Sequence, residues 1–131
     1  MIKGFSLDIY DSDISFAWDS NPKEIEAFFE QAGATEEARK EAMDVLSQGD
    51  TGAMTICYSA TNIIVVFKEE PTHKVVAHEI YHVAHRIMTP RLIEDQEAWA
   101  YLIGHLTEMF YGLHDETIDT EQILPTSEND E

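Results

Sequence analysis

The residues best suited to chemistry are two histidines and a glutamate in the segment His78-Glu79-Ile80-Tyr81-His82. Because residues four apart lie on one face of an α-helix, both imidazoles could reach a single metal ion. Glu79 would lie about 100° around the helix from His78, where its carboxylate can contact a metal-bound water without becoming a ligand. The segment therefore predicts a zinc site with His78 and His82 as ligands and Glu79 as the general base of a hydrolytic reaction.

The motif is expected in the middle of a helix that ends at about Met88, where Thr89-Pro90 stops it. Its histidines share one face, and its apolar residues share the opposite one. The apolar stripe consists of Val76, Ile80, Val83 and Ile87. This pattern predicts that the helix packs its apolar stripe into a core and turns the histidines away from it.

His85 lies on the same face as the two predicted ligands, but about 10 Å along the helix axis from His78. That separation is too large for one ion to bind His85 together with both other histidines. The interpretations left open are a role behind the ligands or beside the substrate, and a solvated surface position.

A catalytic zinc site usually takes a third protein ligand and keeps one position for water. Glu94, Asp95 and Glu97 are the candidates, all near the start of a last helix expected over about residues 93–113. Glu97 faces away from the apolar arc of that helix, on an arc that carries Tyr101 and small residues suited to close helix packing. We therefore predict Glu97 as the third ligand, with Glu94 next; the alternative is that this arc faces water.

The motif helix and the start of the last helix resemble a known protein family. The stretch VVAHEIYHVAHRIM followed by EDQEAWAYLIGHL resembles the zincin superfamily of metallopeptidases in its gluzincin form. More narrowly, it is similar to small metallopeptidase-like proteins of bacteriophage and prophage genomes. The resemblance covers about residues 63–113 and implies zinc bound by His78, His82 and Glu97, with Glu79 as the base.

The leading hypothesis is a zinc-dependent peptidase that hydrolyses peptide bonds through a zinc-activated water. Tyr101 and His105, one and two turns beyond Glu97, are candidate donors to the tetrahedral oxyanion. The strand over residues 63–67, or its neighbour, could provide an edge to which a substrate adds as a further strand.

Two other functions stay open. One is a non-catalytic binding module stabilised by zinc, which would have a fourth protein ligand such as His85 or His114. The other is an acidic inhibitor that imitates DNA to bind a basic protein, with the motif incidental. Trp99 and Phe110 on the apolar arc of the last helix are compatible with a homodimer, although core packing is the alternative use of that arc.

The remaining pattern predicts one small α+β domain, zincin-like by the resemblance. Alternating apolar residues indicate an N-terminal hairpin with Phe5, Leu7 and Ile9 on one strand, and a nearly all-apolar strand indicates burial on both faces. The expected elements are a hairpin within 5–18, helices over 22–31 and 35–46, strands over 54–58 and 63–67, the motif helix, and the last helix. We expect the domain to span residues 1–113 and residues 114–131 to form a flexible acidic tail.

Composition limits the partners. The formal net charge is −18, with 26 acidic and 8 basic residues, and no Lys or Arg follows Arg91. Binding to nucleic acid or to an anionic membrane is therefore not expected, since the phosphate term would be repulsive. The N-terminus lacks the pattern of a signal peptide and Cys57 is the only cysteine, so we expect a cytoplasmic protein, in a bacterial host if it is phage-encoded.

Overall fold

The computed structural model describes residues 1–47, 52–59 and 61–119. It has α+β architecture, with four strands in one mixed sheet and four α-helices. The strands are β1 (Ile2–Leu7), β2 (Ser12–Trp18), β3 (Ala53–Ser59) and β4 (Asn62–Phe67). The α-helices are α1 (Pro22–Ala32), α2 (Glu36–Ser47), α3 (His73–Met88) and α4 (Gln96–Asp119), and short 3-10 turns cover Asp8–Tyr10 and Thr89–Arg91.

The sheet has the strand order β1-β2-β4-β3, so β1 and β3 form its two edges. The outer pairs β1–β2 and β4–β3 are antiparallel hairpins, whereas the central pair β2–β4 is parallel. Residues 63–67 of β4 are all buried, which confirms the prediction that this apolar strand is covered on both faces.

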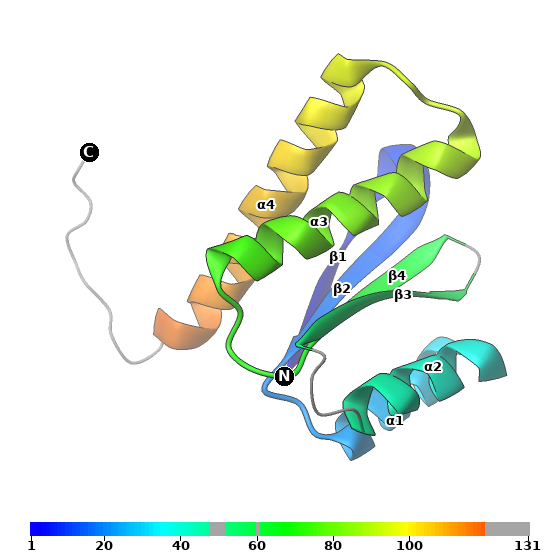
Figure 1. Ribbon diagram of the computed structural model, residues 1–131, viewed down its shortest axis with the longest axis vertical. Coiled ribbons are helices and arrows are strands. Elements are labelled where there is room, and N and C mark those ends of the chain that lie inside the picture. The colour runs from blue at the N-terminus through cyan, green and yellow to red at the C-terminus, as the bar shows by residue number, and fades with distance from the viewer. Residues whose placement is uncertain (48–51, 60, 120–131) are drawn as a thin grey trace.

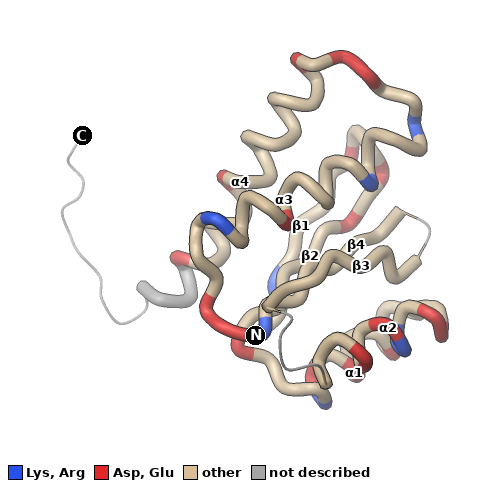
Figure 2. Tube along the Cα trace, viewed as in Figure 1, with Lys and Arg blue, Asp and Glu red and all other residues tan. Residues whose placement is uncertain are grey.

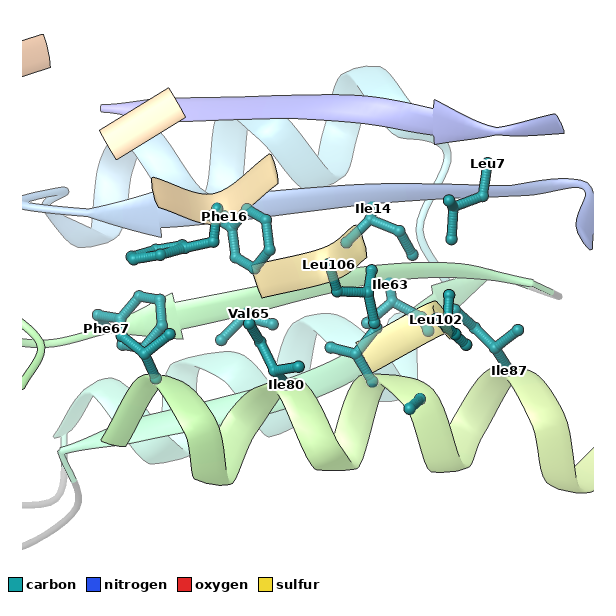
Figure 3. Close-up of a cluster of buried hydrophobic side chains, with 14 of the residues drawn as sticks. Leu7, Ile14, Phe16, Ile63, Val65, Phe67, Ile80, Ile87, Leu102 and Leu106 are labelled. Carbon is teal, nitrogen blue, oxygen red and sulfur yellow. The ribbon is translucent and has the colours of Figure 1, made fainter. Parts of the chain in front are cut away.

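The sheet is the middle of three layers (Figure 1). Helices α1 and α2 cover one face and pack on strand residues such as Ile56 and Ile64. Helices α3 and α4 cover the other face, with Ile80 and Ile87 of α3 and Leu106 of α4 in the core. Figure 3 shows these side chains meeting those of β2 and β4.

Helix α3 ends where the sequence indicates, and its start is capped by Thr72. The Thr72 side chain accepts a hydrogen bond from the backbone N–H of Val75 at 3.2 Å, and the helix stops at Met88 before Pro90. The predicted apolar stripe is confirmed, with all four of its side chains 2% exposed or less. Burial of each contributes on the order of 1.5–3 kcal/mol, so the orientation of α3 is fixed by its apolar side.

Two elements, β1 and α4, differ from the expectation. Ile9 was expected on a strand, but it lies in the 3-10 turn after β1 and is 82% exposed, because the chain turns at Asp11 in a left-handed conformation (φ 52°). Helix α4 begins at Gln96 and continues to Asp119, past the expected end at Leu113. His114, assigned to a flexible tail, is only 8% exposed and packs in the helix; residues 120–131 lie outside the described residues.

Candidate metal centre

His78 and His82 lie one turn apart on the exposed side of α3, opposite its apolar stripe. Their Nε2 atoms are 3.2 Å apart, and their rings meet edge-on with a 77° angle between the planes. Two imidazoles bound to one tetrahedral zinc ion at about 2.0–2.1 Å would hold their nitrogens about 3.3 Å apart. The two side chains therefore have the spacing that a single zinc ion needs.

The protein is strongly acidic (Figure 2), yet Glu79 is the only acidic residue of α3, and it is 6% exposed. Its Oε1 accepts a hydrogen bond of 2.7 Å from the Thr55 hydroxyl, while its Oε2 lies 4.0 Å from His78 Nε2. One carboxylate oxygen is thus anchored and the other stands beside the histidine pair. A carboxylate with one free oxygen in this position could accept a proton from a water bound beside the pair.

Thr55 is the site residue that the sequence did not identify. It lies on the edge strand β3, is 4% exposed, and occupies the face of the strand that turns toward α3 with Ala53 and Cys57. The available signal was a hydroxyl residue within an apolar strand, since a buried hydroxyl normally has a hydrogen-bond partner. The identity of that partner depends on how α3 crosses the sheet.

Glu97, the predicted third ligand, lies in the first turn of α4 and is exposed. Its backbone N–H donates to Asp95 Oδ1 at 3.0 Å. Across residues 1–47, 52–59 and 61–119, no three His, Cys, Asp or Glu side chains gather closely enough to hold a metal ion. The structure thus pairs His78 with His82 but does not bring Glu97 to them, while Glu94 lines a cavity together with Tyr81 of the motif.

The three residues predicted to support the site occupy two different places. The His85 ring lies 6.1 Å from that of Tyr81 and 6.2 Å from that of Trp99, next to the motif. Tyr101 and His105 instead line a second cavity with residues 6–10, beside β1 and thus near the sheet edge opposite β3. This placement does not support an oxyanion role for Tyr101 and His105.

His114 was a candidate fourth ligand under the binding-module alternative. Its Nε2 lies 2.8 Å from Glu70 Oε2, and its ring stacks on Phe110 with centroids 5.4 Å apart. Trp18 contacts the same imidazole at 5.3 Å. His114 therefore belongs to the packing between α4 and the segment before α3.

Comparisons with protein-family models, curated proteins and solved structures found no match. No helix in the described part of the chain is long and apolar enough to span a membrane. The case for a function consequently depends on the residues of α3 and their surroundings.

Proposed function

We propose that this chain is a zincin-type, zinc-dependent peptidase. The observation that carries the proposal is the 3.2 Å spacing of His78 Nε2 and His82 Nε2 beside a buried Glu79 with one oxygen anchored. Removing an ionisable carboxylate from water costs free energy. A functional site would explain why a buried carboxylate is kept next to a pair of surface histidines.

In this proposal His78 and His82 hold the ion through Nε2, and Glu97 at the start of α4 is the third ligand. When bound, zinc supplies Lewis acidity, which polarises a carbonyl group and lowers the pKa of water to about 7. Within the described residues Glu97 does not lie beside the pair, so its role as the third ligand is the part of the proposal that zinc-binding measurements must test.

Glu79 moves the protons of the reaction at its Oε2 atom. Water loses a proton to Oε2 while its oxygen attacks the carbonyl carbon, and Oε2 then gives that proton to the leaving nitrogen as the C–N bond breaks. The second proton of the attacking water passes from the new carboxylic acid to the amine, so the products are a carboxylate and an ammonium group. Thr55 acts as a positioning residue, since its hydroxyl donates a hydrogen bond to Oε1 and Oε2 stays available for the proton transfers.

Strand β3 offers a place for the substrate backbone. It is an edge strand, paired only with β4 among the described strands, and it carries Thr55 next to the motif. A peptide that adds to this edge as a further strand would run alongside Glu79.

Zinc content and hydrolysis of a broad peptide library, measured for the parent protein and Glu79→Gln, test the proposal. We expect zinc in both proteins and hydrolysis in the parent alone. Equal rates in the two proteins would exclude Glu79 as the base, and a zinc-free parent would exclude the metal site.

A further inference from the structure

A cavity of about 660 Å³ opens between the C-terminal end of α3 and the start of α4. The two helices are close where His73 Nδ1 meets the Tyr111 hydroxyl at 2.5 Å, and they diverge toward the segment that joins them (Figure 1). The cavity has the size of ordinary ligand sites. Its walls are mainly apolar and include Tyr81, Leu92, Ile93, Trp99 and Ile103.

Two exposed apolar side chains line this cavity. Among the described residues five large apolar side chains are well exposed, and two of them, Tyr81 (50%) and Leu92 (84%), line it. Leu92 also has a left-handed backbone conformation (φ 58°, ψ 35°), which is uncommon for a residue other than glycine. This left-handed residue ends the 3-10 turn at residues 89–91, and it leaves the Leu92 side chain exposed at the cavity.

The turn that presents Leu92 is held on several sides. The Leu92 N–H donates to the Thr89 carbonyl at 3.0 Å, and the Ile93 N–H donates to the Met88 carbonyl at 3.1 Å. The Arg91 guanidinium donates to the Ile87 carbonyl at 2.7 Å and also to the Tyr10 carbonyl. Leu92 therefore stays exposed because its neighbours fix the backbone.

Tyr81 connects the wall of the cavity to the proposed catalytic site. The Tyr81 ring lies 6.0 Å from Trp99 in the cavity wall and 6.2 Å from His82, one of the proposed zinc ligands. Because an extended peptide advances about 3.3 Å per residue, one or two residues would bridge from the cavity to the histidine pair.

Two carboxylates not used by the proposed metal site lie at the cavity. Glu94 lines it and Asp95 follows, as part of the red segment before the start of α4 (Figure 2). No salt bridge to these two carboxylates occurs within residues 1–47, 52–59 and 61–119, and Arg91 is directed to backbone carbonyls and the Tyr10 ring. The charge favours a cationic occupant.

We propose that this cavity binds a bulky apolar side chain of a peptide that carries Lys or Arg beside it, which defines the substrate class of the proposed peptidase. A second copy of the chain is disfavoured as the occupant by a net charge of −18 on each copy. The chain's own residues 114–131 are disfavoured as well, because they contain acids and no Lys or Arg. The inference rests on the proposed function for the position of the cleaved bond, whereas binding to the cavity can be measured without cleavage.

The test uses the zinc-loaded Glu79→Gln protein, so that bound peptide is not consumed. The capped peptides Gly-Phe-Arg-Gly, Gly-Ala-Arg-Gly and Gly-Phe-Glu-Gly are titrated to millimolar concentration. Binding is followed by NMR on the indole N–H of Trp99, which donates to the Ile93 carbonyl at 2.8 Å in the cavity wall. The indole of Trp18, 4% exposed in the core, is the internal control.

We expect a saturable shift of the Trp99 signal alone. Binding of the alanine and glutamate peptides should be at least about tenfold weaker, because the first lacks the bulky apolar side chain and the second lacks the positive charge. Glu94→Lys should weaken binding of the Phe-Arg peptide, whereas Glu108→Lys, the same charge change further along α4, should not. Equal affinity for all three peptides, an equal effect of both lysine variants, or no saturable shift would overturn the inference.

These outcomes separate the two proposals. If the Phe-Arg peptide binds at Trp99 but the parent protein cleaves nothing, the cavity assignment stands and the peptidase proposal fails. If the parent cleaves peptides without regard to an apolar residue, the peptidase proposal stands and the cavity assignment fails.

Discussion

The Thr55 hydroxyl donates a 2.7 Å hydrogen bond to Glu79 Oε1, and this bond ties the edge strand β3 to the motif helix α3 at the proposed catalytic carboxylate. Both side chains are buried, at 4% and 6% exposure. A buried carboxylate oxygen that loses its donor retains the cost of leaving water, so the bond matters for stability as well as for the direction of Oε2.

Thr55→Val keeps the shape of the side chain and removes the hydroxyl. We expect a loss of about 1–3 kcal/mol in the free energy of unfolding, because Glu79 Oε1 is left without a partner. Thr55→Ser restores the donor and should recover most of this loss, which urea unfolding of the three proteins measures. In a hydrolysis assay Thr55→Val should lower kcat more than it changes KM; an unchanged kcat would rule out a positioning role.

The histidine pair should bind about one zinc ion per chain, since a single ion fits its spacing. Elemental analysis of protein purified without chelator measures the content. His78→Ala and His82→Ala should each lose the metal, while His105→Ala, an exposed histidine near β1, should keep it. Zinc retained at the parent level in His82→Ala would contradict the site.

Glu97→Gln should weaken zinc binding at least about tenfold, because even residues that only hydrogen-bond to metal ligands contribute that much to metal affinity. Glu94→Gln is the matched control, an equal change three residues earlier. Competition with a chelator of known affinity gives both constants. A larger effect in Glu94→Gln would indicate that the third ligand is Glu94, which lines the cavity with Tyr81.

Glu79→Gln should keep zinc and fold, since the Thr55 hydroxyl can still donate to an amide oxygen. Hydrolysis should fall by ~10²–10⁴-fold, the usual contribution of a general base. Single-turnover cleavage of the best library peptide by parent and variant measures the difference. A fall in zinc content would instead point to Glu79 as a ligand.

His114→Ala should destabilise the fold by about 0.5–3 kcal/mol, because the imidazole packs between Trp18 and Phe110 and pairs with Glu70. Thermal unfolding measures the effect. Glu108→Ala, an exposed position earlier on the same helix, should change little. Equal stability of the two variants would contradict the packing role of His114 and would agree with the flexible tail that the sequence predicted.

Local patterns in the sequence were sufficient for α3 and β4. Thr89-Pro90 marks the end of α3, and the spacing of Ile80 and Ile87 defines its buried side, which in turn places His78 and His82 on the opposite one. Hydrogen bonds between residues four apart and apolar periodicity act within one element, so they can be read without knowing the neighbours. The end of α4 could not be read in this way, because His114 is held by Trp18 and Glu70, which lie far away in the sequence.

The sequence by itself thus determined the element types, the α+β class, and the grouping of two histidines and one glutamate on a helix. Only the tertiary structure decided that β2 pairs with β4 in parallel, that Thr55 meets Glu79, and that Tyr101 and His105 lie toward β1 rather than beside the histidine pair. The physical reason is that side chains from different elements meet only after the helices have crossed the sheet. The angle and register of that crossing come from the packing of the whole core, not from the spacing of residues in any one segment.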